Sequence, residues 1–143
     1  MFIGQYEHHL EKKNRLSVPK KFRSQLENGG ILSQGLDGCL FLYPKAAWTQ
    51  LVAKVSELPL TKADARDFTR GLSFGAVEVE TDSLGRILIP DYLRQFAGIK
   101  TDCMIAGAVD RVEIWASDRF VKYTTQINSR REEIAEKLSE AGI

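Results

Sequence analysis

The residue types that could do chemistry gather in one short basic cluster near the N-terminus. Within twelve residues, and with no acidic residue among them, lie Lys12, Lys13, Arg15, Lys20, Lys21 and Arg23. Lysine supplies a mobile positive charge for a phosphate group, and arginine presents a forked pair of donors that matches the edge of guanine. Because a two-stranded β-ribbon fits into a DNA major groove, a hairpin that carries arginine is expected to contact double-stranded DNA. The alternative for the lysines is that they only keep the surface soluble.

Arg15 and Arg86 share a second pattern, because each follows a carboxylate by four residues across an expected turn. Arg15 follows Glu11, and Arg86 follows Asp82. Each pair is expected to form a salt bridge or a hydrogen-bonded brace. The brace could be purely structural, or the carboxylate could also orient the guanidinium for contact with DNA, and both interpretations stay open here.

The residues that usually carry catalysis are few and poorly placed. The only two histidines, His8 and His9, are adjacent on an expected strand, so their side chains point to opposite faces and cannot converge on one ligand. Asp64 and Asp67 lie three apart on an expected helix, where a solvated face is the ordinary explanation. No phosphate-binding loop, nucleophile elbow or metal-ligand spacing occurs. We therefore expect no enzyme activity, no small-molecule substrate, no cofactor and no metal site.

The composition is that of an ordinary soluble globular protein. The chain has 143 residues, of which 43% are hydrophobic and 27% charged, and its formal net charge is +1. This near-neutrality excludes a uniformly basic nucleic-acid coat protein. Without the six cations of the basic cluster, 14 basic residues stand against 19 acidic ones, a balance of −5. The basic cluster is therefore a local electrostatic feature, and it predicts an oriented binding face.

No feature of the chain predicts a membrane or secreted location. The longest apolar runs, such as residues 39–43, are too short to cross a bilayer, and the N-terminus lacks the segments typical of a signal peptide. Cys39 and Cys103 sit in apolar stretches without metal-ligand spacing, so we expect buried, reduced thiols. These features predict a cytoplasmic protein without a membrane partner.

The chain is predicted to be a duplicated module. When the sequence is displaced by 71 residues against itself, identical residues coincide at five positions in one region. The pairs are Gly4 and Gly75, Glu7 and Glu78, Arg15 and Arg86, Pro19 and Pro90, and Arg23 and Arg94. Their common order, with a shared Arg-x-x-x-Pro-x-x-x-Arg frame, carries more weight than the number of identities.

Each copy shows the same series of local signals, from an alternating strand to a second hairpin. The expected strands are residues 3–9 and 16–18 in the first copy and residues 74–80 and 87–89 in the second. Asn14 and Gly85 are expected in the turns between them, because both residue types accept a left-handed conformation. Pro19 and Pro90 are then expected at the first position of a short helix, where the missing N–H costs nothing. The second hairpins are expected to turn at Asp37-Gly38 and Asp110-Arg111.

Longer helices are expected outside these hairpins. Apolar residues at helical spacing predict a helix over residues 48–57, which Pro59 ends, and Thr61 is expected to cap a second helix. A long amphipathic helix is predicted over residues 117–141. Its distal half is strongly charged, so it forms either a solvated face or an interface with another subunit.

One segment resembles a known DNA-binding signature. Residues 82–90, Asp-Ser-Leu-Gly-Arg-Ile-Leu-Ile-Pro, resemble the signature of AbrB-type swapped-hairpin domains. With the duplication, segments 36–44, 58–61, 64–66 and 110–115 make the chain similar to the MraZ family of transcriptional regulators. The resemblance implies an α+β fold in which two AbrB-like swapped-hairpin β modules form an intrachain pseudo-dimer. The implied parts are a first module at 1–48, a helical connection at 49–73, a second module at 74–120 and a C-terminal helix tail at 121–143.

The MraZ resemblance also implies a function. Such proteins are bacterial, cytoplasmic and nucleoid-associated regulators that bind short, repeated G-containing boxes upstream of division and cell-wall genes, usually as repressors. They form ring-like homo-oligomers, so one ring presents many hairpins to tandem boxes. The main alternative is an AbrB-like antitoxin that neutralises a partner protein through its tail. The two modules and the helix-like tail disfavour this alternative.

The resemblance places the site residues on the two hairpins. The family pattern Asp-x-x-x-Arg fits Asp82 and Arg86 directly, whereas Glu11 and Asn14 replace Asp and Gly in the first copy. DNA contacts are expected from Arg15, Arg86, Lys12, Lys13, Lys20 and Lys21. A bracing role is expected for Glu11, Asp82, Asn14 and Gly85. Because residues 82–94 of the second copy are neutral, the first module is expected to supply most of the attraction to phosphates.

Overall fold

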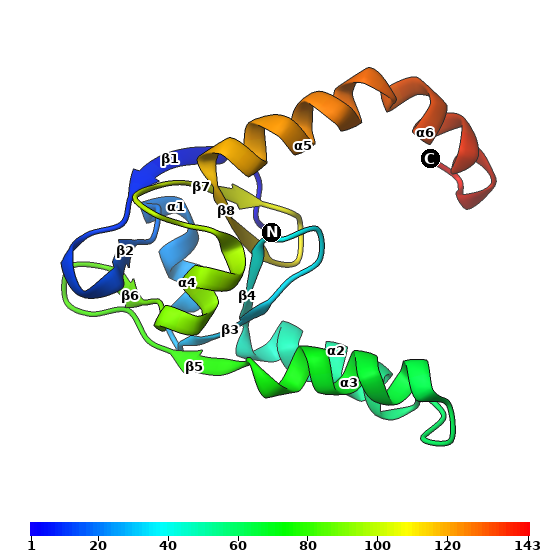
Figure 1. The fold of residues 1–143 in the computed structure, drawn as a ribbon, viewed down its shortest axis with the longest axis horizontal. Helices are drawn as coiled ribbons and strands as arrows, with labels where there is room; N and C mark the ends of the chain where they lie inside the picture. Colours follow the sequence, from blue (N-terminus) through cyan, green and yellow to red (C-terminus); the bar gives the residue numbers. More distant parts are fainter.

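Two antiparallel sheets and two helical arms make up the chain, and the computed structural model describes all residues from 1 to 143 (Figure 1). The strands are β1 (Gln5–His9), β2 (Arg15–Ser17), β3 (Gly30–Gln34), β4 (Leu40–Pro44), β5 (Val77–Val79), β6 (Arg86–Leu88), β7 (Asp102–Gly107) and β8 (Val112–Ala116). The α-helices are α1 (Lys20–Arg23), α2 (Lys45–Ser56), α3 (Ala63–Phe74), α4 (Asp91–Ala97), α5 (Ser117–Ser129) and α6 (Arg131–Lys137). The short 3-10 helices are η1 (Lys12–Asn14), η2 (Ser24–Leu26) and η3 (Ser139–Ala141). The α+β class predicted from the sequence is confirmed.

The predicted duplication is visible as the same series of elements in both halves. Strand β2 begins at Arg15 and β6 begins at Arg86, which is 71 residues later. Helices α2 and α5 begin at Lys45 and Ser117, which are 72 residues apart, and each follows directly on the last strand of its half. The repeated unit therefore extends beyond the hairpins into the long helices.

The six-stranded sheet mixes strands of the two halves in the order β1-β7-β8-β4-β3-β5. The first strand of each half pairs with the other half. Strand β1 lies against β7, with Tyr6 opposite Ile105, and β5 lies against β3, with Glu78 opposite Ile31. In the middle of the sheet, β4 pairs with β8. Neither half completes a sheet of its own, so the two halves form one folded unit.

The second sheet is a two-stranded ribbon of β2 and β6, with one strand from each half. Leu16 lies opposite Ile87, and both side chains are buried. Pro19 and Pro90 come next and occupy the N-cap positions of α1 and α4. The sequence predicted both prolines at the first helical position, and the structure places them one residue earlier. Their carbonyls accept the first helical hydrogen bonds, so the chain turns from the ribbon directly into each helix.

Both halves contribute to the main core, a cluster of 19 buried residues. Phe22 on α1 packs edge-on against Phe2 and Tyr6, with ring centroids 5.3 and 5.5 Å apart. A smaller cluster of five buried residues lies under α2 and α5. Cys39 and Cys103 are free and buried, as expected, and burial raises the pKa of each thiol to about 12. Both thiols are therefore protonated at neutral pH.

The long C-terminal helix predicted over residues 117–141 is interrupted. Arg130 has φ and ψ of −115° and 11°, outside the helical range, so α5 and α6 are separate helices. Asn128 and Ser129 precede the break and are weak helix formers. The Ser129 hydroxyl donates to the Gln126 carbonyl 2.7 Å away, which offers the backbone a local alternative to the helix.

Two helix starts differ from the prediction. Helix α2 begins at Lys45, three residues before the predicted start at residue 48. Thr61 does not cap α3. The Lys62 N–H donates to the Pro59 carbonyl at 3.0 Å, which places Thr61 inside a turn. The Lys62 carbonyl then accepts a bond from the Arg66 N–H at 3.1 Å, so Lys62 holds the N-cap position. Because a turn after Pro59 already orients the chain, the helix begins without a side-chain cap.

The second hairpins turn near the predicted positions. Residues 37–38 both have positive φ, 64° and 85°, as predicted for this turn. In the second half, the Ala108 N–H donates to the Arg111 carbonyl at 2.9 Å, so the turn is centred on Val109 and Asp110. This turn lies one residue before the prediction, because Arg111 is held on the sheet side by an ion pair with Glu113.

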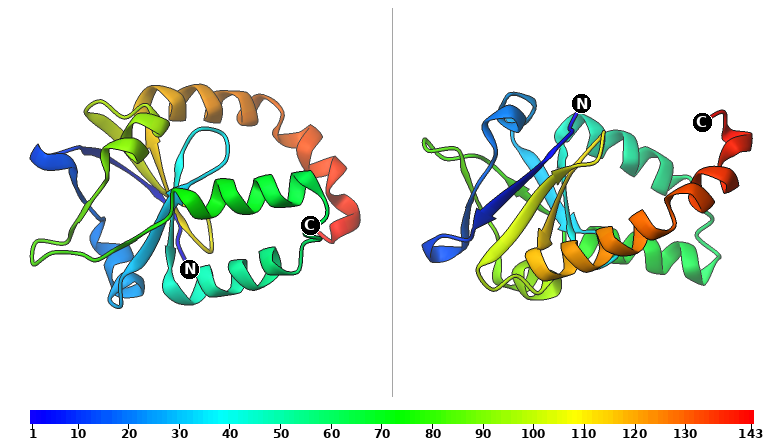
Figure 2. Two further views of the ribbon diagram at one scale, coloured as in Figure 1. Left: turned by 60° about the horizontal axis from the view of Figure 1, so that its bottom comes forward. Right: turned by 90° about the horizontal axis from the view of Figure 1, so that it is seen from above.

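The long helices project from the sheet as two arms, and the β2–β6 ribbon lies at the opposite end of the molecule (Figures 1 and 2). Helices α2 and α3 form one arm, and α5 and α6 form the other. None of these helices has both the length and the apolar character that crossing a membrane requires. The ribbon end and the arms are thus separate surfaces.

Candidate nucleic-acid interface

Two short loops, residues 11–15 and 82–86, project from the same end of the molecule (Figure 2). Because Arg15 of the first lies 3.7 Å from Asp82 of the second, we call them the paired loops. Each loop closes with the same backbone hydrogen bond. The Glu11 N–H donates to the Arg15 carbonyl at 2.8 Å, and the Asp82 N–H donates to the Arg86 carbonyl at 2.8 Å. The duplicated pattern of a carboxylate followed by arginine therefore folds the same way twice.

The paired loops turn on residues with a left-handed backbone. Asn14 has φ 58° and Gly85 has φ 76°, as their residue types predicted. Lys13 also has a positive φ of 62°, which the sequence did not indicate. Lysine rarely adopts this conformation, so the surrounding fold must hold the backbone of Lys13 in place. The side chain of Lys13 is exposed.

Each loop is anchored to the other half of the chain. The Val18 N–H donates to the Gly85 carbonyl, and the Ile89 N–H donates to the Asn14 carbonyl, both at 2.9 Å. The Asn14 side-chain amide also donates to an Asp91 carboxylate oxygen at 2.6 Å. These crosswise bonds fix the positions of the loops relative to one another.

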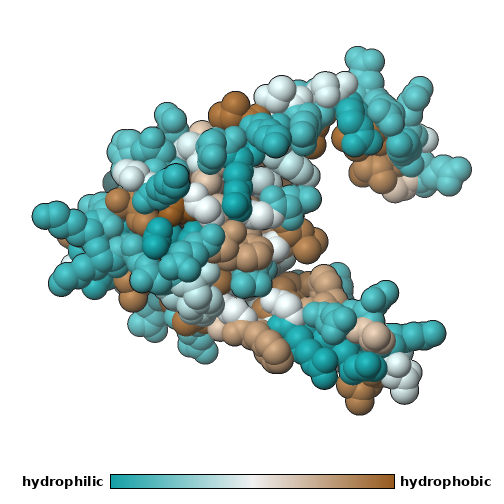
Figure 3. All heavy atoms as spheres, viewed as in Figure 1, coloured by the Kyte–Doolittle hydropathy of each residue, from teal (hydrophilic) through white to brown (hydrophobic).

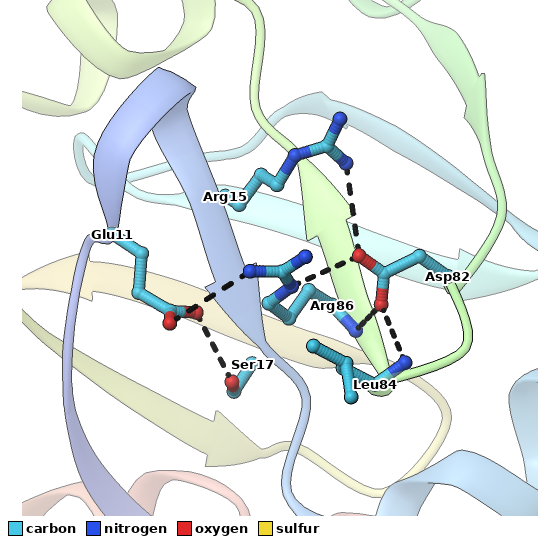
Figure 4. Close-up of polar contacts among 6 residues, drawn as sticks. All are labelled: Glu11, Arg15, Ser17, Asp82, Leu84 and Arg86. Atoms are coloured by element: carbon cyan, nitrogen blue, oxygen red, sulfur yellow. Dashed lines mark hydrogen bonds and ion pairs between the residues drawn. The ribbon is translucent and has the colours of Figure 1, made fainter.

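Asp82 is the centre of the polar contacts between the loops (Figure 4). Its Oδ1 accepts hydrogen bonds from the backbone N–H groups of Leu84 and Arg86, each at 2.9 Å. Its Oδ2 accepts a bond from Arg86 Nε at 2.9 Å and lies 3.7 Å from Arg15 Nη1. One carboxylate thus shapes its own loop and orients an arginine from each half.

Glu11 does not brace Arg15, which the sequence pattern suggested. Its carboxylate lies 3.9 Å from Arg86 Nη1 and accepts a weak hydrogen bond from the Ser17 hydroxyl at 3.4 Å (Figure 4). The reason is the ribbon register, because Ser17 lies opposite Arg86. The partner of Glu11 is therefore set by pairing across the ribbon, whereas Asp82 keeps Arg86 of its own loop, and Arg86 stands between Asp82 and Glu11.

Both arginines keep donors for an outside partner. The side chain of Arg15 makes no hydrogen bond within the chain and is 37% exposed. Arg86 is 26% exposed and donates through Nε, while its Nη2 contacts no carboxylate. Arg86 is thus held by a hydrogen bond and two carboxylates, whereas Arg15 is held only by its ion pair with Asp82.

Arg23 has a positioning role that sequence reasoning did not assign. Its Nε donates to the Val18 carbonyl at 2.8 Å, and its guanidinium lies against Gly85, where a Cβ atom would come within 2.3 Å of Cζ. In the other half, Arg94 donates to Asp91 at 3.2 Å. The signal was present in the sequence, because both arginines end the repeated Arg-x-x-x-Pro-x-x-x-Arg frame.

The exchange of strands divides the basic cluster between the paired loops. Lys12 and Lys13 lie on the first loop, whereas Lys20 and Lys21 lie on α1, next to Val18 and its bond to the second loop. All four lysines are exposed and none forms an ion pair within the chain. Hydrophilic side chains cover this end of the molecule (Figure 3). The lysines all belong to the first half in sequence, but in space they flank both loops.

The contacts of Asp82 predict a pH dependence. The Arg86 backbone N–H is the main cause that holds the pKa of Asp82 below its ordinary value of 3.8, and the Arg86 side chain and the Leu84 N–H add to it. A lowered pKa means that the ionised carboxylate stabilises the fold at pH values above 3.8 and that this contribution is lost as pH falls through the lowered value. The excess stability of the wild type over Asp82→Asn should therefore be constant near neutral pH and shrink in acid. Denaturant unfolding of both proteins across pH measures this difference.

An exposed carboxylate outside the loops supplies the control for this measurement. Asp118→Asn removes one acidic group from α5, far from the ribbon. If the wild type keeps its full advantage over Asp82→Asn down to the lowest pH at which the chain stays folded, the Asp82 carboxylate does not stabilise the loop in the way its geometry indicates.

Comparison with known proteins shows which family this chain resembles. The model of a family described as "MraZ protein, putative antitoxin-like" matches residues 1–71 and again residues 72–140. The chain is 48% identical to the transcriptional regulator MraZ of Pelotomaculum thermopropionicum, covering 96% of this chain and 95% of the relative. It is 46% identical to the protein of that name from Clostridium beijerinckii over the full length of both chains. The same full coverage holds for the one from Thermoanaerobacter pseudethanolicus, at 47% identity.

Proposed function

Because the chain belongs to the MraZ family, we propose that it is an oligomeric, sequence-specific DNA-binding protein that regulates transcription. The observation that carries the proposal is the pair of interlocked loops at the exposed end of a β-ribbon. There, Arg15 and Arg86 surround the Asp82 carboxylate, and both keep free guanidinium donors. A two-stranded ribbon of this kind fits the DNA major groove, where the base edges carry distinct donor and acceptor patterns.

The arginines and the lysines take different parts in the proposed complex. Arg86, held in place by Asp82 and Glu11, presents its remaining donors to a guanine edge, and Arg15 contacts a neighbouring base. Because the guanidinium is already oriented, less side-chain freedom is lost on binding. The charges of the two arginines are balanced by the two carboxylates. The flanking lysines therefore supply the attraction to phosphate groups.

The finer parts of the proposal follow from the family. The operator is a set of short, repeated G-containing boxes upstream of division and cell-wall genes, and binding represses transcription. The protein acts as a ring-like homo-oligomer in the cytoplasm, associated with the nucleoid, and without catalysis. Several ribbons on one particle would bind tandem boxes together, which raises the overall affinity without improving any single contact.

A titration of the protein against tandem G-box DNA and against scrambled DNA of equal length tests the function. We expect tighter binding to the boxed DNA and a steep loss of affinity for both DNAs as salt rises, because phosphate contacts release counterions. Equal affinity for the two DNAs would remove the claim of sequence-specific recognition. A flat salt dependence would remove the role of the lysines.

An antitoxin is the second candidate, and it is favoured by the antitoxin-like character given to the matched family. In this alternative, an arm of the molecule binds and neutralises a small toxin. The α5–α6 arm is helical, whereas an antitoxin of this type would use a disordered tail. Recovery of a stoichiometric small toxin with the purified protein would support this candidate over the DNA regulator.

The lysines of the first loop yield a prediction about non-specific affinity. Lys12→Ala combined with Lys13→Ala should weaken binding to boxed and scrambled DNA by the same factor, because phosphates are common to both. The slope of log affinity against log salt should fall in magnitude by about 1 for each lysine that contacts a phosphate. Titrations at several salt concentrations measure both effects.

Two lysines on the arms provide the matched control. Lys54→Ala combined with Lys122→Ala removes the same charge from α2 and α5, away from the ribbon end. This control should bind DNA like the wild type. An unchanged salt slope in the Lys12 and Lys13 variant, or a loss confined to the boxed DNA, would contradict the assignment.

A further inference from the structure

Helix α6 has no partner within its own chain. Every hydrogen bond and ion pair of residues 131–137 stays within the C-terminal arm. Ile134 and Leu138 belong to neither buried cluster, and Leu138 is 48% exposed. A helix of this length is not stable in water from its own hydrogen bonds. We therefore expect its apolar residues to pack against a surface outside the chain.

The exposed face of α6 is an apolar stripe edged by positive charge. Ile134 and Leu138 are four residues apart and share one face of the helix. At about 100° per residue, Arg131 and Lys137 flank this stripe, whereas Glu132 lies on the opposite face. Arg131 makes no ion pair, and Lys137 forms an exposed pair with Glu133 at 2.9 Å that it can exchange for a partner's carboxylate. Figure 3 shows apolar side chains on the inner side of this arm, toward the space between the two arms. A matching surface would be an apolar groove with an acidic edge.

The other arm contains such a groove, where α2 and α3 meet the sheet. It has a volume of about 430 Å³, and its apolar lining includes Leu36, Phe41, Leu51, Phe68, Leu72 and Phe96. Leu36 and Phe68 are 60% and 45% exposed. The one cation that lines the groove, Arg111, is neutralised by Glu113 at 2.8 Å and Asp110 at 3.0 Å. The groove thus offers an apolar floor without a free positive charge.

Two carboxylates extend the groove along α3. Asp64 lies four residues before Phe68, and Asp67 lies four residues before Gly71, so both share the face of the residues that line the groove. Asp64 has no ion pair, and the one contact of Asp67 is a distance of 3.9 Å to the exposed Arg70. Such a contact screens little of the charge. The edge of the groove is therefore acidic, as the basic edge of α6 requires.

We propose that the α6 helix of one copy of this chain docks in the α2–α3 groove of a second copy. Ile134 and Leu138 enter the apolar groove, and Arg131 and Lys137 pair with Asp64 and Asp67. The inference deepens the proposed function and rests on its homo-oligomer. Because helix and groove are different surfaces, the contact is head-to-tail, and such a contact closes into a ring when the rotation between copies allows it.

Complementary charge reversals test the docking, read as particle mass by light scattering during size-exclusion chromatography. One variant carries Asp64→Lys and Asp67→Lys, and the other carries Arg131→Glu and Lys137→Glu. Alone, each places like charges across the interface, so the concentration for half-assembly should rise at least roughly tenfold. In a one-to-one mixture every helix meets a groove of opposite charge, so the wild-type mass should return. Recovery in the mixture also proves that both variants fold.

The opposite face of the same helix supplies the control. Glu132→Lys with Glu136→Lys reverses as many charges on α6 and should leave the particle mass unchanged. Leu138→Asp, at a half-exposed position, should dissociate the assembly while the near-ultraviolet circular dichroism of the buried aromatic residues stays as in the wild type. A wild type that is monomeric with and without DNA would overturn the docking. Variants that keep the wild-type mass, or a mixture that fails to recover it, would also do so.

The test separates the docking from the DNA function. The substitutions lie on the arms, so a dissociated variant should still prefer boxed over scrambled DNA, with weaker overall binding. If wild-type particles dissociate as predicted but never prefer boxed DNA, the proposed function fails and the interface stands. If boxed DNA is preferred while the charge reversals leave the assembly intact, the interface fails and the function stands.

Discussion

Replacing Arg86 with alanine is expected to reduce the preference for boxed over scrambled DNA by about 5- to 150-fold for each contact that reads a guanine. The physical reason is the loss of a forked donor whose direction is fixed by Asp82 and Glu11. Affinity for scrambled DNA should change much less, because the lysines that contact phosphates remain. Competition between boxed and scrambled DNA at constant salt measures the effect.

Arg86→Lys is the matched control for this prediction. Lysine keeps the positive charge but cannot present two parallel donors to one base. The affinity for scrambled DNA should therefore stay close to that of the wild type, while the preference for boxed DNA is lost. If Arg86→Ala instead lowers the melting temperature while the folded protein keeps its full preference for boxed over scrambled DNA, the arginine only braces the loops.

A fragment of residues 1–71 is expected not to fold as a monomer, although it contains one complete copy of the family pattern. In the fragment, β1 loses β7, β2 loses β6 and β3 loses β5. The main core of 19 residues is also divided, because both halves contribute to it. Circular dichroism in the near ultraviolet should show no fixed environment for the aromatic residues of the monomeric fragment. Sedimentation should show an expanded chain.

Mixing the fragment with residues 72–143 provides the control. The complementary strands then become available, so the near-ultraviolet signal and the compact size of the intact chain should return. Self-association of the fragment at high concentration is compatible with the exchange, because a second copy offers similar strands. A compact monomer of residues 1–71 with a cooperative melting transition would contradict the interleaved sheet.

Much of the local structure could be predicted because it depends on neighbouring residues. The turn conformations of Asn14 and Gly85 follow from residue type, and Pro19 marks the start of a short helix. The errors are also local. The break at Arg130 and the missing cap at Thr61 arose where side chains or turns offered the backbone a competing hydrogen bond.

The pairing of side chains across the ribbon was beyond such local rules. The spacing of Glu11 and Arg15 suggested a brace, but the register that sets Ser17 opposite Arg86 brings Glu11 to the other arginine. The role of Arg23 against Gly85 depends on the same exchange between the halves. These contacts join residues more than 60 positions apart in the chain, and no spacing within one module encodes them.

The sequence by itself determined the duplicated module, the α+β class and the residue types at the two turns, because periodicity and backbone preference are properties of short segments. Only the tertiary structure decided which strands pair, and hence that the halves are interleaved. It also decided that Asp82 gathers both arginines and that the lysines of one half flank both loops. The physical reason is that burial of a shared core selects which strands pair. The strand pairing then determines which oppositely charged side chains lie close enough to interact.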